Sequence, residues 1–176
     1  MKNAEEIFEV LKQQFGDAII GLDKDTPTEP IISADPLQIH KIAAFLRETE
    51  ELKFDSLMCL SGADDANGTK AKDADGFDVI QGGTLSVYYH LDSVELKQKI
   101  TLKVSTDREN PKVESVENIW KCADWHEREA FDLYGIVFLN HPDLRRILMP
   151  YDWEAGYPLR KDYKNPEFYQ GMKVPY

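Results

Sequence analysis

A His-Glu pair and two cysteines are the residues of this sequence to consider first as metal ligands. Each set can be compared with the spacing that metal binding requires. His126-Glu127 begins a His-Glu-x-x-His motif, in which two histidines one helical turn apart bind zinc, but the second position is Ala130. The only cysteines, Cys59 and Cys122, are too far apart in the chain for a Cys-x-x-Cys site, and too few for an iron–sulfur cluster. We therefore expect no metal site in this chain.

Two loop sequences partly match known ligand-binding loops. Residues 62–70 share glycines and a lysine with the phosphate-binding P-loop, but five residues separate the glycines and Thr69 precedes the lysine. Asp73-Ala74-Asp75-Gly76 matches part of a calcium loop, yet the position of its bidentate glutamate is Gly82. A Gly-x-Gly-x-x-Gly dinucleotide motif is also missing from the sequence. We expect neither nucleotide nor calcium binding.

The segment 123–134, which ends at Gly135, is dense in charged and aromatic residues at helical spacing. A helix would place Trp125, Arg128, Glu129 and Asp132 on one face, and Ala123, Glu127, Ala130, Phe131 and Tyr134 on the other. Arg128 and Asp132 are four residues apart and are expected to pair, as on a solvated surface helix.

Glu127 does not fit a simple surface helix, because it lies within an apolar stripe. A buried carboxylate needs a cation, and the candidates are four basic residues that follow in the chain: Arg145, Arg146, Arg160 and Lys161. We favour a structural ion pair over general acid–base catalysis, since no second catalytic group accompanies Glu127.

The elements that must position these residues follow from hydrophobic spacing. Helical periodicity predicts helices over residues 3–15, 36–51, 110–119 and 123–134. Alternation or short apolar runs predict strands over 17–22, 30–32, 54–61, 85–91 and 100–104, with 54–61 central in the sheet and the last two forming a hairpin. Residues 63–77 are expected to form an exposed loop. This order predicts an α+β fold with a mainly antiparallel sheet and helices packed on it.

The C-terminal part of the chain has a different composition. Its prolines, which exclude long helices, recur every eight or nine residues at Pro142, Pro150, Pro158, Pro166 and Pro175. All three tryptophans also lie after residue 119. We predict an α+β domain over residues 1–135 and an extended C-terminal segment, rich in proline and aromatic residues, over 136–176. The segment either folds back on its own domain or docks on a partner chain, and its aromatic content favours a partner.

Composition limits the class of protein. The 176 residues carry a net charge of −11, which disfavours binding to the phosphate backbone of nucleic acids. Residues 1–119 account for −10 of this charge and residues 120–176 for −1. No apolar run is long enough to span a membrane and no signal peptide begins the chain, so we expect it to stay where it is made. Its two distant cysteines give no disulfide framework, which favours a reducing cytoplasm.

Three sequence blocks occur in order over some forty residues, and together they are far more specific than any short motif. They are Trp125-His126-Glu127-Arg128-Glu129-Ala130-Phe131-Asp132-Leu133-Tyr134-Gly135, then His141-Pro142-Asp143-Leu144-Arg145-Arg146, then Pro158-Leu159-Arg160-Lys161-Asp162-Tyr163. This string closely resembles the 30-kDa subunit family, also called the C subunit, of the proton-pumping NADH–quinone oxidoreductase, respiratory complex I.

The resemblance implies a non-catalytic subunit of the peripheral arm, at the cytoplasmic face of the bacterial inner membrane. It implies that the chain holds no cofactor, while flavin, iron–sulfur clusters and quinone belong to the complex. The expected partners are subunits D, B and I, of which D is the quinone-site subunit and forms one wall of the quinone site. Two alternatives remain open: the equivalent subunit of a ferredoxin-linked dehydrogenase or membrane-bound hydrogenase, and a stand-alone binding module.

Overall fold

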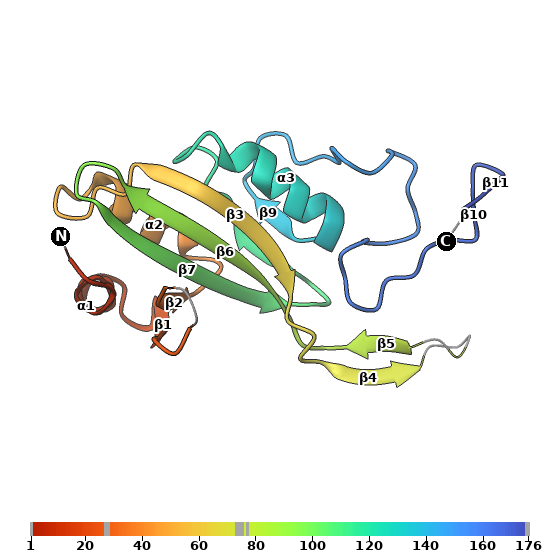
Figure 1. The fold of residues 1–176 in the computed structure, drawn as a ribbon, viewed down its shortest axis with the longest axis horizontal. Helices are drawn as coiled ribbons and strands as arrows, with labels where there is room; N and C mark the ends of the chain where they lie inside the picture. The colour runs from red at the N-terminus through yellow and green to blue at the C-terminus, as the bar shows by residue number, and fades with distance from the viewer. Residues whose placement is uncertain (1, 27–28, 73–75, 77, 175–176) are drawn as a thin grey trace.

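A five-stranded sheet forms the centre of the protein (Figure 1). The computed structural model describes residues 2–26, 29–72, 76 and 78–174. In spatial order the strands are β1 (Ile19–Asp23), β2 (Ile31–Ala34), β7 (Gln98–Asp107), β6 (Thr84–Ser93) and β3 (Ser56–Asp64). Neighbouring strands run antiparallel except β2 and β7, which are parallel. The predicted α+β class with a mainly antiparallel sheet is confirmed.

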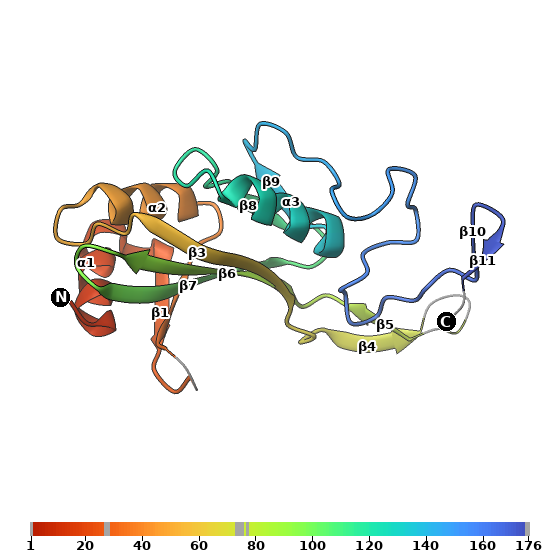
Figure 2. The same ribbon diagram turned by 45° about the horizontal axis from the view of Figure 1, so that its top comes forward.

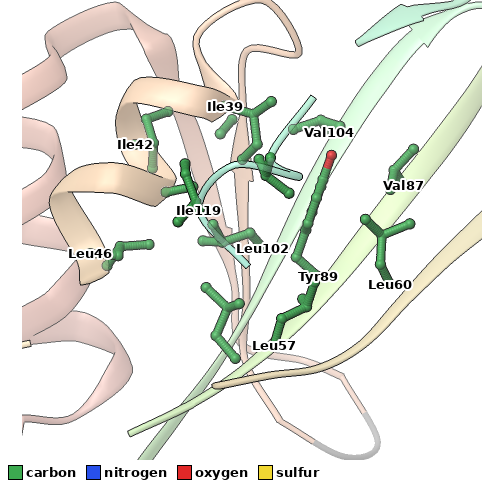
Figure 3. Close-up of a cluster of buried hydrophobic side chains, with 14 of the residues drawn as sticks. Ile39, Ile42, Leu46, Leu57, Leu60, Val87, Tyr89, Leu102, Val104 and Ile119 are labelled. Atoms are coloured by element: carbon green, nitrogen blue, oxygen red, sulfur yellow. The ribbon is translucent and has the colours of Figure 1, made fainter. Parts of the chain in front are cut away.

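Three helices accompany this sheet in the described part of the chain: α1 (Ala4–Phe15), α2 (Ile39–Glu48) and α3 (Ala123–Tyr134). Figure 2 shows α2 above one end of the strands and α3 toward the other. In Figure 3, Ile42 and Leu46 of α2 lie on one side of the cluster and Leu102 and Tyr89 of the sheet on the other, with Ile119 between the helix and the sheet. Burial of these apolar side chains is the main force that holds helix and sheet together.

The predicted hairpin is formed by β6 and β7, whose residues alternate between core and solvent. Val87 lies opposite Val104 and Tyr89 opposite Leu102, and all four side chains are buried. The period of two therefore identified both strands correctly. The strand over 54–61 also exists as β3, but it lies at the edge of the sheet rather than at its centre. An apolar run indicates burial, and here α3 buries an edge strand.

The predicted loop over residues 63–77 is wrong in part. Strand β3 continues to Asp64, and β4 (Thr69–Lys72) pairs with β5 (Asp78–Gln81) in a hairpin that extends away from the main sheet (Figure 1). These strands are short and mostly polar, so they lack the apolar signal on which the prediction depended. Asp73 and Asp75 of the calcium-like sequence lie outside the described residues.

The helix predicted over residues 110–119 is also wrong. This segment contains the short strand β8 (Lys112–Glu114), which pairs in parallel with β9 (Val137–Leu139), followed by turns. Val113 and Val116 are both buried. Two buried residues three positions apart are typical of a helix, but a strand followed by a turn can place them in the core as well. Because β9 comes after Gly135, the segment predicted to be extended begins with a strand of this small sheet.

After β9, the C-terminal segment runs past the end of α3, returns along the β4–β5 hairpin and ends in a small hairpin (Figures 1 and 2). That hairpin consists of β10 (Phe168–Tyr169) and β11 (Met172–Lys173). None of the helices among the described residues is long and apolar enough to cross a membrane.

Candidate functional site

The buried carboxylate of Asp132, near the end of α3, holds the first part of the C-terminal segment. Its Oδ2 accepts hydrogen bonds from the backbone N–H groups of Ile147, Leu148 and Met149, at N···O distances of 3.0, 2.7 and 2.9 Å. Its Oδ1 lies 2.8 Å from Nη1 of Arg146. Burial raises the pKa of Asp132, but these donors outweigh burial and bring it below its ordinary value. Asp132 is therefore ionised at neutral pH.

Arg128 does not pair with Asp132, which corrects the pair expected from their spacing. Its Nη1 lies 3.7 Å from Oδ1 of Asp124, and its Nε donates to the carbonyl of Arg145 at 3.5 Å. Its guanidinium carbon is 4.7 Å from the ring centroid of Trp125, a cation–π distance. The reason for the difference is that the C-terminal segment contacts Arg128 and Asp132 on this face, so Arg128 is buried instead of solvated, while Trp125 and Glu129 stay exposed.

Glu127 is fully buried as expected, but the expected ion pair with an arginine or lysine of residues 145–161 is wrong. Its Oε2 accepts from the hydroxyl of Ser115 at 2.6 Å, and its Oε1 accepts from the backbone N–H of Val116 at 2.8 Å. These donors are neutral, so burial dominates and raises the pKa of Glu127 to about 7. The carboxylate therefore fixes the turn after β8 to α3.

His141, in the second sequence block, lies near Glu127. Its side chain is fully buried, and its Nε2 is 3.9 Å from Oε2 of Glu127 and 3.4 Å from Oδ1 of Asp124. The backbone N–H of Asp143 donates to its Nδ1 at 3.1 Å. Because Nδ1 accepts this bond, the ring proton belongs on Nε2, which donates to the backbone carbonyl of Asp124 at 3.3 Å. His141 thereby ties the second block to the start of α3.

The third block, residues 158–163, docks on the other end of α3. The backbone N–H of Leu159 donates to the carbonyl of Leu133 at 3.1 Å, and Nε of Arg160 donates to the carbonyl of Tyr134 at 2.8 Å. The guanidinium of Arg160 also stacks 4.6 Å from the ring centroid of Tyr157. These contacts satisfy carbonyl groups that the end of a helix leaves without intrahelical partners.

Gly135 allows this close approach. It ends α3 in the left-handed conformation, with φ of 78°. A Cβ atom at this position would lie 2.4 Å from Cζ of Tyr157, so only glycine leaves room for the tyrosine ring.

The remaining block residues divide into exposed and half-buried groups. Leu144 packs against the core, and Pro158, Asp162 and Tyr163 are half-buried. The side chains that stay exposed in this chain are Trp125, Glu129, Pro142, Asp143, Arg145, Leu159 and Lys161. Buried members of the three blocks thus bind the segment to α3, and exposed members form an outer surface.

Sequence reasoning missed two residues that contact the third block, Asp64 and Arg108. Nη1 of Arg108 lies 2.5 Å from Oδ2 of Asp64, and its Nη2 lies 2.5 Å from Oδ1 of Asp162. Asp64 falls in the predicted loop, and Arg108 follows a strand among other charged residues, so neither has a periodic signal. The carboxylates of Asp64, Glu127 and Asp132 thus accept hydrogen bonds from N–H or O–H groups of other segments and hold these segments in place.

Comparison with known proteins places these features in a family. The family model described as "Respiratory-chain NADH dehydrogenase, 30 Kd subunit" matches residues 32–169, which include all three sequence blocks. The chain belongs to this family. Two relatives, both named as the C subunit of NADH-quinone oxidoreductase, are similar along almost all of this chain. One, from Chloroherpeton thalassium, is 47% identical over 98% of this chain; the other, from Chlorobium phaeobacteroides, is 40% identical over 100%. This chain spans 65% of the first relative's length and 98% of the second's.

Solved structures share the fold of this 30-kDa family member. The trypsin-resistant fragment (1–134) of Nqo5 has a TM-score of 0.56 and 21% identity, covering 77% of this chain and 97% of its own. A chain of the membrane-bound sulfane sulfur reductase, an archaeal respiratory membrane complex, has a TM-score of 0.60 and 18% identity, covering 91% of this chain and 85% of its own. At these identities the likeness establishes the fold alone.

Proposed function

We propose that this chain is a non-catalytic structural subunit in the peripheral arm of a proton-translocating NADH–quinone oxidoreductase. In this role it supports the quinone-site subunit, D, and neighbours subunits B and I, at the cytoplasmic face of the inner membrane. Its family and its relatives named as the C subunit support the proposal. Electrons pass from NADH to quinone through flavin and iron–sulfur clusters that other subunits hold.

The observation that carries this proposal is where the exposed apolar side chains lie. Ten large hydrophobic side chains are exposed in the described part of the chain, and six of them belong to α3 or the segment after it: Trp125, Leu148, Tyr151, Leu159, Phe168 and Met172. Tyr151 is 81% exposed. Aromatic and apolar anchors of this kind concentrate binding energy in protein interfaces, so we place the contact with the quinone-site subunit here.

Co-purification from the native host tests this function. We expect a tagged chain to recover subunits D, B and I together with an NADH-binding flavin subunit, and the preparation to reduce quinone with NADH. A ferredoxin-linked or hydrogenase partner set would replace the proposal by the equivalent role in a sister complex. Recovery of the chain alone as a folded monomer would support a stand-alone binding module instead.

A matched pair of variants tests the surface. Leu148→Ser with Tyr151→Ser removes two exposed anchors, and we expect at least a tenfold weaker binding of the quinone-site subunit, which corresponds to about 1.4 kcal/mol. Val94→Ser is the control, because Val94 is 65% exposed at the β6–β7 turn, away from the C-terminal segment. Equal binding by both variants would contradict the proposed surface.

The chain itself is proposed to hold no redox group. With two distant cysteines and no dinucleotide-binding motif, it offers neither the ligands of an iron–sulfur cluster nor a flavin or nicotinamide loop. Metal analysis and a visible spectrum of the purified chain test this. Stoichiometric iron, zinc or flavin would contradict it.

A further inference from the structure

Arg108, which directly follows β7, lies at the point where four segments of the chain meet. The side chain is buried, and its two terminal nitrogens face Asp64 at the end of β3 and Asp162 of the C-terminal segment, each at 2.5 Å. A guanidinium is a rigid planar fork, so it can hold two carboxylates in one fixed geometry. Arg108 therefore connects the C-terminal segment to two strands of the main sheet.

The two carboxylates extend the connection through the backbone. Oδ2 of Asp64 accepts from the backbone N–H of Lys161 at 2.9 Å, and Oδ2 of Asp162 accepts from the backbone N–H of Ile80 in β5 at 3.0 Å. The C-terminal segment thus binds the β4–β5 hairpin as well as the sheet. Charge-assisted hydrogen bonds of this kind are stronger than neutral ones, and this group is largely shielded from water.

We propose that Arg108 is a positioning residue that latches residues 157–163 and the β4–β5 hairpin to the sheet within the isolated chain. This part of the outer surface is then ordered before any partner binds, so the entropy of ordering it is not lost at the interface. The latch concerns the chain alone. Its value for assembly with the quinone-site subunit rests on the proposed function.

Amide hydrogen exchange of the full chain tests the latch. The reporter is the N–H of Leu159, which donates to the carbonyl of Leu133 and not to a carboxylate of the latch. We expect Asp162→Ala to speed exchange at Leu159 and Lys161 at least tenfold more than it speeds exchange at the amides of Tyr89 and Leu102 in the core. The control is Asp78→Ala, because this exposed carboxylate on the same hairpin pairs with the exposed Lys72.

Two results would overturn the latch. One is wild-type exchange at Leu159 in Asp162→Ala, and the other is equal acceleration in the segment and the core, which would indicate a merely structural role. If Asp162→Ala does not fold, Asp162→Asn removes the charge with little change of shape and is judged by the same criteria.

Variants of Arg108 itself test the fork geometry. Arg108→Lys keeps the charge but cannot face both carboxylates as a fork, so we expect fast exchange at Leu159 with this variant too; protection equal to wild type would contradict the fork. All of these measurements use the chain without a partner. Failure of the latch therefore leaves the proposed function standing, and failure of co-purification leaves the latch standing.

Discussion

Glu127 and Asp132 are two buried carboxylates on one helix whose pKa values move in opposite directions. Asp132 accepts from three backbone N–H groups and faces Arg146, and its pKa falls despite burial. Glu127 accepts from a hydroxyl and one backbone N–H, and burial raises its pKa to about 7. Burial raises the pKa of both carboxylates; the donors around Asp132 outweigh this effect, whereas the two neutral donors to Glu127 do not.

The raised pKa of Glu127 predicts a pH-dependent stability. A group whose pKa rises on folding contributes stability that is fully present below its unfolded value of 4.5 and is lost as the pH rises through about 7. Over this range the contribution amounts to about 3 kcal/mol. The Gln side chain of Glu127→Gln stays neutral and can still bond to Ser115 and Val116. We therefore expect the free energy of unfolding of this variant, relative to that of wild type, to increase as the pH rises from 5 to 9.

Urea denaturation at pH 5, 7 and 9 measures this difference. Glu129→Gln is the control, because Glu129 is exposed on the same helix. A difference between Glu127→Gln and wild type that does not change with pH would contradict the assignment.

The sequence identified Glu127 as a buried carboxylate but gave it the wrong partner. The apolar stripe of α3 is a local pattern and could be read directly. Its donors are on Ser115 and Val116, in a segment that was expected to be a helix, so the contact depended on an element that was itself wrongly predicted. Arg108 and Asp64 were missed for a related reason, since an ion pair between distant segments leaves no periodic signal in either.

The joint between α3 and the C-terminal segment depends on Gly135. The residue ends the helix with a positive φ, and the ring of Tyr157 occupies the space where a side chain would lie. The helix could be predicted through to this glycine from the sequence. The close packing of Tyr157 against Gly135 could not be predicted, because the two residues are distant in the chain.

Gly135→Ala should therefore destabilise the protein for two reasons. The left-handed backbone costs about 1–2 kcal/mol for a residue with a Cβ atom, and overpacking against Tyr157 costs about 1–3 kcal/mol more. Gly156→Ala is a matched control, because Gly156 has φ of 92° but open space around its Cβ position. Urea denaturation should show a clearly larger loss for Gly135→Ala; equal losses would mean that Tyr157 moves away freely.

Among the other elements, strong periodicity was predicted well and short polar strands were not. The β6–β7 hairpin and the helices α1 and α2 each bury an apolar face, which the sequence displays. Helix α3 also buries charged side chains, but its spacing and its end at Gly135 were enough to predict it. Strands β4, β5 and β8 have three or four residues each, and their pairing partners determine them more than their own side chains do. The edge position of β3 is a property of the whole sheet and could not be read from its sequence.

The C-terminal segment binds its own domain over part of its length and leaves other side chains exposed. Residues 157–163 contact α3, Asp64 and Arg108, whereas Tyr151, Phe168 and Met172 remain exposed. Folding back on its own domain therefore holds for residues 157–163, and docking on a partner stays a prediction for the exposed part of the segment.

Two truncations separate these parts. Ending the chain after Leu148 removes Asp162 and the N–H of Met149 that bonds to Asp132, and we expect a loss of about 2–5 kcal/mol in unfolding free energy. Ending it after Asn165 keeps these contacts, so stability should stay close to wild type while binding of the quinone-site subunit weakens. Thermal denaturation and a binding assay with that subunit measure both effects; a stable 1–148 chain would contradict the docking of this segment on its own domain.

The parallel pairing of β2 with β7 has a consequence for the order in which the protein is made. Ile31 lies opposite Thr101, so the first two strands join the main sheet only after β7 has been synthesised. During synthesis, the sheet surface against which the N-terminal elements pack is missing until β3, β6 and β7 have been made. Until then, apolar side chains of α1, β1, β2 and α2 stay exposed to solvent. A nascent chain that stalls before residue 98 is therefore the form most exposed to aggregation and most dependent on chaperones.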